Sequence, residues 1–216
     1  MVPTRFVFLA KIFTFLSKTR RLFLAAMEIV QLGQMEPWSQ RVAENIVLRG
    51  VERISNKPII HFMHGNGFCG LVYKPFLSGL LTDYDLFLLD AQGHGDSDAG
   101  DRFLGWNAMA EHCLEVLLEQ RKRWNGRPVV AVAHSFGALM TLLMVDRRPD
   151  LFERIVLLDP VLFTPWMYPM ARLSEFFGLT RYNPMSRRTL KRRTEWASRA
   201  LARKALHGRG IFRGWR

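Results

Sequence analysis

A serine at position 135 stands in the pattern Ala-His-Ser-Phe-Gly, between an apolar β-branched run and a run rich in leucine and methionine. Residues 129–132 predict a buried parallel strand, and residues 138–145 predict a helix. A sharp strand-to-helix turn lifts one hydroxyl above the sheet edge, and the helix N-terminus behind it favours developing negative charge. Larger side chains two positions before or after the serine would collide as strand and helix close up. The pattern predicts a nucleophile at Ser135, although a serine that only caps a buried helix would show the same residues.

Two glycine-containing loops follow other predicted strands. Residues 58–63 form an unbroken apolar run that leads into His-Gly-Asn-Gly at residues 64–67. Residues 85–90 form a similar run that leads into Gln-Gly-His-Gly-Asp-Ser-Asp at residues 92–98. Continuous apolar runs of this length indicate strands buried on both faces. Each loop is therefore expected at the end of a central strand.

The remaining pattern completes an alternation of strands and helices. A strand pattern covers residues 41–53, helices are predicted at residues 71–81 and 107–124, and a last strand ends at Asp159. This alternation predicts an α/β fold of three layers, with helices flanking a mostly parallel sheet. Ligands bind beyond the carboxyl ends of the strands in such sheets. Both glycine loops, Ser135 and Asp159 are expected at that edge, which would make it an active site.

Composition and charge restrict the class of protein. The 216 residues are 49% hydrophobic and 23% charged, which is typical of one globular domain. The net charge is +12, but residues 1–27 carry +5 and residues 187–216 carry +10, so the middle of the chain is slightly acidic. A basic chain can indicate nucleic-acid binding, yet the spacing of these cations shows no nucleic-acid fold signature. We expect no nucleic-acid partner.

The two cysteines, Cys69 and Cys113, show neither metal-ligand spacing nor a disulfide framework. We therefore expect no metal site and a reducing, cytoplasmic setting. The segment at residues 1–27 combines many apolar side chains with five cations and no acid. It is too interrupted for a spanning helix and favours a basic amphipathic helix that lies on a membrane or on the domain. Peripheral membrane association is thus expected.

The chain is expected to have three parts. Residues 1–40 form an N-terminal extension, residues 41–160 form the α/β core, and residues 161–216 form part of a helical cap. In the last part, residues 187–206 predict a strongly basic helix whose charged face is either solvated or attracted to anionic lipid or an acidic substrate.

The serine turn and the two glycine loops, in this order, resemble the α/β-hydrolase superfamily, most closely its capped esterase, lipase and acyl-hydrolase branch. The resemblance covers roughly residues 44–206. It implies a serine hydrolase that needs no cofactor and acts on a small, apolar ester or related acyl substrate. A serine at position 135, where related dehalogenases and epoxide hydrolases need a carboxylate, argues against those two branches.

The resemblance also implies roles for individual residues. Ser135 matches the nucleophile, and the backbone N–H of Phe136 matches one oxyanion donor. Asn66 matches the second donor through its backbone N–H, within the loop framed by Gly65 and Gly67. Backbone donors of this kind contribute about 3 kcal/mol each to stabilising a tetrahedral oxyanion.

The acid and the base are not placed by the resemblance, because the later strands that carry them in the family are not visible in the sequence. Three alternatives follow: a fragment that ends inside the cap, a catalytically silent binding module, or a shortened enzyme that uses Asp159 and His207. Asp159 precedes a proline and can equally be a structural turn, and His207 can equally stabilise a helix C-terminus. If the later strands are missing, the edge of the last strand is expected to be uncovered.

Overall fold

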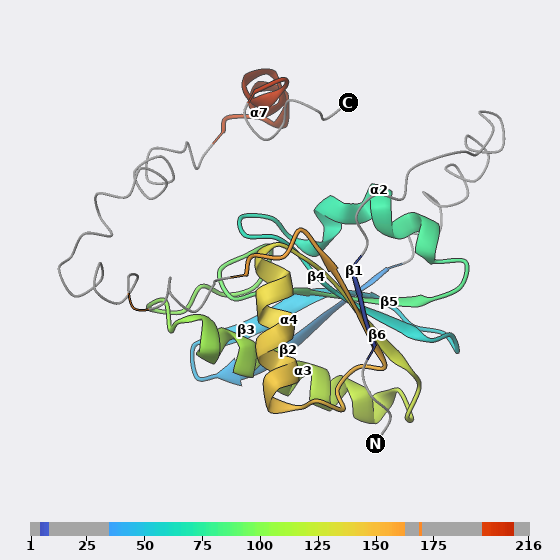
Figure 1. The fold of residues 1–216 in the computed structure, drawn as a ribbon. Helices are drawn as coiled ribbons and strands as arrows, with labels where there is room; N and C mark the ends of the chain where they lie inside the picture. Colours follow the sequence, from blue (N-terminus) through green and yellow to red (C-terminus); the bar gives the residue numbers. More distant parts are fainter. Residues whose placement is uncertain (1–4, 9–34, 163–168, 170–195, 210–216) are drawn as a thin grey trace, which may run out of the picture. The chain divides into compact units, whose positions relative to one another are not determined.

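The computed structural model describes residues 5–8, 35–162, 169 and 196–209 of the chain (Figure 1). The chain divides into two compact units, Met1–Leu162 and Phe163–Arg216. The expected start of the cap, at residue 161, lies next to the division between the units.

The first unit is built on a seven-stranded sheet (Figure 1). In sequence the strands are β1 (Arg5–Phe8), β2 (Glu36–Ala43), β3 (Ile46–Arg53), β4 (Ile59–Met63), β5 (Asp85–Asp90), β6 (Val129–His134) and β7 (Arg154–Leu158). Their order across the sheet is β1-β7-β6-β4-β5-β3-β2. The pairs β1–β7, β7–β6, β6–β4 and β4–β5 are parallel, and β5–β3 and β3–β2 are antiparallel. The sheet is mostly parallel, as predicted.

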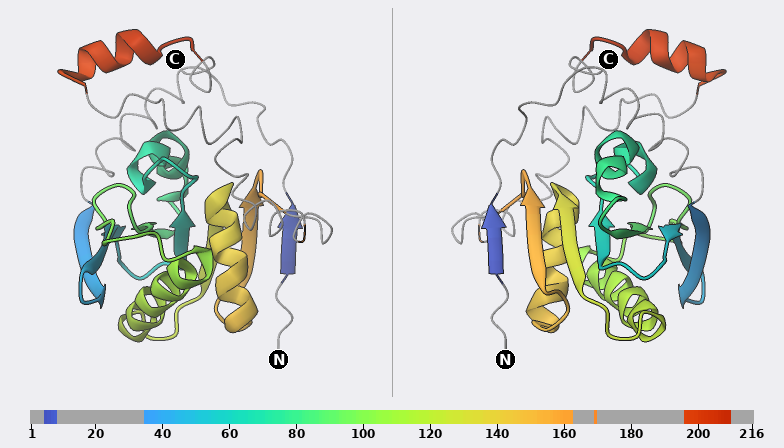
Figure 2. Two further views of the ribbon diagram at one scale, coloured as in Figure 1. Left: turned by 90° about the vertical axis from the view of Figure 1, so that its left-hand side faces the viewer. Right: turned by 90° about the vertical axis from the view of Figure 1, so that its right-hand side faces the viewer.

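Helices cover both faces of this sheet, which confirms the predicted three-layer α/β fold. They are the short turns η1 (Gly70–Tyr73), α2 (Lys74–Leu77) and η2 (Ser78–Leu80), and the longer α3 (Trp106–Arg123) and α4 (Phe136–Arg147). Helices α3 and α4 lie side by side on one face of the sheet (Figure 2). Their buried residues belong to one hydrophobic cluster with Phe87 and Leu89 of β5. Leu86 and Leu88, which alternate with them, pack against the segment of α2 on the other face. Because successive strand residues face opposite sides, the central strands are buried on both faces.

The strand predicted at residues 41–53 is two strands joined by a tight turn at Glu44 and Asn45. The hairpin is locked onto β5 by Trp38, whose ring stacks on Phe87 at 4.7 Å and whose indole N–H donates to the carbonyl of Leu88. The boundary expected between residues 40 and 41 lies inside β2, so the core begins earlier in the sequence.

The prediction of a helix over residues 1–27 is wrong for Arg5–Phe8, which form β1 and pair in parallel with β7. An uncovered strand edge presents unpaired backbone groups, and the sequence Arg-Phe-Val-Phe has high strand propensity. The expectation that β7 keeps an uncovered edge is therefore also wrong. Residues 9–27 lie outside the described part of the chain.

The predicted helix at residues 71–81 is a series of three short helical segments, and the helix predicted at 107–124 is α3. In the second unit, α7 (Arg199–Leu206) falls within the basic helix predicted at 187–206. Most of the predicted cap lies outside the described residues. Among the helices that the structure describes, none combines the length and apolarity needed to cross a membrane.

Candidate active site

Ser135 is the single residue between the end of β6 and the start of α4. Its backbone has φ 52° and ψ −112°, a conformation that is strained for a residue with a side chain. The turn is held from the neighbouring strand, because the Ser135 N–H donates to the carbonyl of Leu158 at 2.9 Å. The Ser135 hydroxyl does not cap α4. The helix-cap alternative for this serine therefore does not describe its side chain.

The prediction that a small residue is needed two positions after Ser135 agrees with the packing at Gly137. A Cβ added at Gly137 would lie 2.4 Å from the carbonyl oxygen of Met63 and 2.6 Å from that of His64. Ala133 is fully buried and lies opposite Met63 on β4 in the sheet register. The serine turn is thus pressed against the backbone that begins the His-Gly-Asn-Gly loop.

The backbone geometry of that loop orients one candidate oxyanion donor. The Gly65 carbonyl accepts hydrogen bonds from the Phe68 N–H at 3.1 Å and from His64 Nδ1 at 2.9 Å. Because a trans peptide is planar, the Asn66 N–H must point opposite to this carbonyl. Within the described residues, neither the Asn66 N–H nor the Phe136 N–H donates a hydrogen bond. Both groups that the sequence analysis assigned to an oxyanion are therefore unused by the protein itself.

His64 braces the loop and does not act on protons at neutral pH. Its Nε2 accepts from the Ala91 N–H at 3.0 Å while its Nδ1 donates to Gly65, which fixes a neutral tautomer. The pKa of His64 is lowered to about 4, mainly by burial; the hydrogen bond to the Gly65 carbonyl opposes this lowering and the nearby His94 adds to it. His64 thereby links the loop after β4 to the end of β5.

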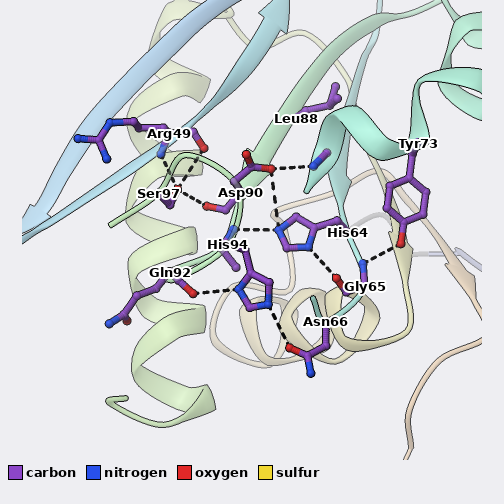
Figure 3. A network of polar contacts seen from close by, with 12 residues as sticks. Arg49, His64, Gly65, Asn66, Tyr73, Leu88, Asp90, Gln92, His94 and Ser97 are labelled. Carbon is purple, nitrogen blue, oxygen red and sulfur yellow. Dashed lines mark hydrogen bonds and ion pairs between the residues drawn. The ribbon is translucent and has the colours of Figure 1, made fainter. Parts of the chain in front are cut away.

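Asp90 organises the second glycine loop from inside (Figure 3). Its Oδ1 accepts from the Gly70 N–H at 2.7 Å, and its backbone carbonyl accepts from the Ser97 hydroxyl at 2.6 Å. A Cβ at Gly95 would lie 1.9 Å from Asp90 Oδ2, so this position needs glycine. Burial raises the pKa of Asp90. These contacts make Asp90 a structural part of the edge.

The second loop also reaches the first loop through His94. His94 Nε2 lies 3.0 Å from Asn66 Oδ1, and His94 Nδ1 lies 3.0 Å from the carbonyl of Gln92 (Figure 3). The His94 ring stacks on Phe136 with centroids 5.8 Å apart. The side chain of Asn66 is thus tied to the loop that packs against the start of α4.

Tyr73 is a functional candidate that the sequence analysis missed. Its hydroxyl accepts from the Gly65 N–H at 3.0 Å and lies 2.7 Å from His134 Nδ1. It therefore joins the His-Gly-Asn-Gly loop to the residue before Ser135. No pattern in the sequence marks Tyr73, because it lies in a helical segment and its partner His134 is 61 positions away.

The two residues weighed as acid and base have different positions. Asp159 follows β7 with φ 47°, is exposed, and lies beside the end of β6, since Leu158 pairs with His134 in the sheet. Its charge raises the pKa of His134, against the larger lowering by burial. His207 is at the C-cap of α7 in the second unit, whereas Ser135 belongs to the first. Among the described residues, no side chain hydrogen-bonds to the Ser135 hydroxyl.

The structure thus brings Ser135, Phe136, the loop of Gly65, Asn66 and Gly67, and Asp159 to one edge of the sheet. Within the described ranges, no group of three or more His, Cys, Asp or Glu side chains could hold a metal ion. Cys69 and Cys113 are both free, and burial raises the pKa of each thiol.

Comparison with known proteins identifies the family to which the chain belongs. Residues 62–215 match the family model described as "Alpha/beta hydrolase family". The chain is 27% identical over 121 residues to (E)-2-((N-methylformamido)methylene)succinate hydrolase of Acinetobacter baylyi, which covers 56% of this chain and 44% of that protein. It is 30% identical over 109 residues to human monoglyceride lipase, which covers 49% of this chain and 35% of the lipase. The aligned part is less than half the length of either relative.

Solved structures show the same fold at lower identity. A putative lipase, Lip1 of Acinetobacter baumannii AYE, is 19% identical with a TM-score of 0.55, and the match covers 70% of this chain and 50% of that one. A mutant form of haloalkane dehalogenase DatA from Agrobacterium tumefaciens C58 is 22% identical with a TM-score of 0.52, over 59% of this chain and 42% of that one. At such identity these likenesses concern the fold alone.

Proposed function

Because the chain belongs to the alpha/beta hydrolase family, we propose that it is a serine hydrolase that cleaves a carboxylic ester or a related acyl bond through an acyl-enzyme on Ser135. The observation that carries this proposal is the strained turn at Ser135, φ 52°, which presents a hydroxyl that caps no helix. Strain of about 1–3 kcal/mol at one residue persists only where the surrounding structure enforces it.

The reaction uses groups at one edge of the sheet. Ser135 Oγ attacks the acyl carbonyl carbon, and the carbonyl oxygen becomes an oxyanion that the N–H groups of Asn66 and Phe136 stabilise. The alcohol leaves with a proton, and water then hydrolyses the acyl-serine. The positive end of α4 adds to the stabilisation of negative charge beside Ser135.

The attack also requires a base for the serine proton. The candidates for the acid and the base in this chain are Asp159 and His207, which follow Ser135 in the order Ser-Asp-His along the sequence. Asp159 supports this role by its exposure next to the end of β6. His207→Gln tests the base. An unchanged reaction rate in this variant would mean that another group takes the serine proton.

The proposed substrate is a small, apolar ester, and no cofactor is needed. Large apolar side chains are exposed on the segments that follow the carboxyl ends of β4, β5 and β7: Leu71, Val72, Phe76, Phe103, Leu104, Trp106, Val161 and Leu162. Exposed apolar groups at an active edge favour an apolar substrate. A cytoplasmic setting with peripheral membrane contact belongs to the same proposal, with the contact confined to residues 9–27 because Arg5–Phe8 pair with β7.

A catalytically silent binding module is the second candidate, favoured by the lack of a side-chain hydrogen bond to the Ser135 hydroxyl among the described residues. A fluorophosphonate probe separates the two, because only a base-activated serine reacts. Covalent labelling that disappears in Ser135→Ala, with an unchanged melting temperature, supports the hydrolase. Absence of labelling in the native chain supports the silent module.

A further inference from the structure

The Tyr73 hydroxyl connects two backbone segments that must keep a fixed relation for the proposed reaction. On one side it accepts the Gly65 N–H at 3.0 Å, and on the other it lies 2.7 Å from His134 Nδ1. Gly65 precedes the proposed oxyanion donor Asn66, and His134 precedes the proposed nucleophile Ser135. The Tyr73 hydroxyl thus contacts both the residue before the proposed oxyanion donor and the residue before the proposed nucleophile.

The protonation states allow the Tyr73 hydroxyl to make both contacts at the same time. Burial raises the pKa of Tyr73, so the phenol keeps its proton, and burial lowers the pKa of His134, whose ring is then neutral at pH 7. The Tyr73 oxygen accepts from the Gly65 N–H, and its O–H can donate to His134 Nδ1 when the neutral ring carries its proton on Nε2. One hydroxyl can serve both contacts because its oxygen accepts a hydrogen bond while its proton is donated.

Gly65 needs such a restraint because glycine has more backbone freedom than any other residue type. A Cβ at Gly65 would lie 2.7 Å from His134 Nδ1 and 3.0 Å from the Tyr73 hydroxyl, so only glycine permits this close approach. The peptide after Gly65 is fixed by the two donors to its carbonyl, from His64 and Phe68. The peptide before Gly65 is fixed by Tyr73, whose ring packs on Phe62 with centroids 4.7 Å apart.

We propose that Tyr73 is a positioning residue, which aligns the oxyanion donor of Asn66 with Ser135 by hydrogen-bonding to Gly65 and His134 at the same time. The inference rests on the proposed function, since it concerns the rate of reaction at Ser135. Tyr73 itself touches no reacting atom. Its removal should lower the rate of the chemical step and leave substrate affinity nearly unchanged.

The test is the rate of covalent labelling of the full chain by a fluorophosphonate, resolved into the maximal rate and the half-saturating concentration. Tyr73→Phe keeps the ring and removes only the hydroxyl, and we expect the maximal rate to fall about tenfold or more with the half-saturating concentration and final extent of labelling unchanged. Tyr84→Phe is the matched control, because the Tyr84 hydroxyl has no hydrogen bond among the described residues. We expect it to label at the native rate.

Variants of His134 test the other end of the contact. An amide oxygen in His134→Asn can still accept from the Tyr73 O–H, whereas His134→Leu cannot. We expect His134→Asn to retain most of the native labelling rate, and His134→Leu to lose about as much as Tyr73→Phe, with no further loss when the two are combined. Native labelling in Tyr73→Phe, or a reduced extent of labelling at the native rate, would overturn the positioning role.

Amide hydrogen exchange separates this inference from the proposed function. The Gly65 N–H should exchange slowly in the native chain and at least tenfold faster in Tyr73→Phe. If the native chain does not label, the proposed hydrolase activity is wrong while faster exchange still supports the link through Tyr73. Equal exchange at Gly65 in the two proteins would overturn the link whatever the labelling shows.

Discussion

At the scale of single residues, two buried histidines, one within β4 and one directly after it, have opposite environments. His64 uses both ring nitrogens in hydrogen bonds, to Gly65 and from Ala91. His61, three positions earlier on β4, is fully buried between the rings of Phe87 and Phe152, and neither of its nitrogens has a hydrogen-bond partner among the described residues. An unpartnered buried polar group costs about 1–3 kcal/mol. His61 should therefore limit stability, whereas His64 supports the site.

The titration of His61 gives a first prediction. Burial lowers the pKa of His61 to about 3 in the folded chain, whereas an unfolded histidine titrates near 6.5. Between these values the unfolded chain binds the extra proton, so the free energy of unfolding falls as the pH decreases below about 6.5. From pH 7 to pH 4.5, His61→Leu should lose about 2 kcal/mol less than the native chain. Urea unfolding of both proteins at the two pH values measures this difference, and parallel losses would contradict it.

The sequence predicts those parts of the site that depend on neighbouring residues. Ser135 and Gly137 lie in one short pattern, and the steric requirement for glycine follows from the turn itself. The contact of Tyr73 with His134 cannot be predicted in this way, because it depends on how a helical segment packs over the sheet. Asp159 can be placed at the edge from its strand, but the contacts of its side chain depend on the rest of the fold.

A second prediction concerns the packing at Gly137. In Gly137→Ala the new methyl group would press on the backbone carbonyls of Met63 and His64, which cannot move as a flexible side chain could. We expect the free energy of unfolding to fall by about 1–3 kcal/mol and fluorophosphonate labelling to decrease strongly. Gly79→Ala is the control, because a Cβ there meets nothing within 4 Å. Urea unfolding of both variants checks the result, and equal stabilities would contradict it.

At the scale of elements, β4 to β7 could be predicted because each is an apolar run buried in the middle of a parallel sheet. The full extent of β2 and the presence of β1, at the two ends of the described sheet, could not. β2 contains Ser39, Gln40 and Arg41 and pairs with a single strand among those the structure describes, so its pattern is weak. The four residues of β1 have high strand propensity, but so short a run does not distinguish a strand from the start of the helix predicted over residues 1–27. It becomes a strand because β7 offers it an edge.

The pairing of β1 gives a third prediction. Deletion of residues 1–8 would remove β1 and expose the backbone of β7, whereas deletion of residues 1–4 would keep the pairing. With backbone hydrogen bonds contributing about 1 kcal/mol each, we expect the longer deletion to reduce stability by about 2 kcal/mol and to promote aggregation. Thermal unfolding and light scattering of the two shortened chains compare them directly. Indistinguishable behaviour would mean that β1 adds nothing to the sheet.

At the scale of the whole molecule, the positive charge and most of the residues proposed to react lie in different parts of the sequence. Most of the residues proposed to react lie between positions 65 and 159, in the slightly acidic middle of the chain, while residues 1–27 and 187–216 carry the positive charge. These cations are separated in the sequence from most of the residues proposed to react. They suit long-range attraction to an anionic surface, which depends on salt.

The last prediction follows from this separation and from the position of β1. Deleting residues 1–27 would confuse membrane contact with loss of a strand, so charge removal is the better change. In a variant with Lys11, Lys18, Arg20 and Arg21 replaced by glutamine, β1 stays intact and four cations are lost. Each cation near an anionic surface contributes about 1 kcal/mol. We expect this variant to co-sediment with phosphatidylserine vesicles much less than the native chain at low salt, and both proteins to dissociate as salt rises.

A variant with Arg187, Arg188, Arg192 and Arg193 replaced by glutamine serves as the comparison at the other end of the chain. Equal binding by the native chain and the N-terminal variant would show that residues 9–27 do not form the contact.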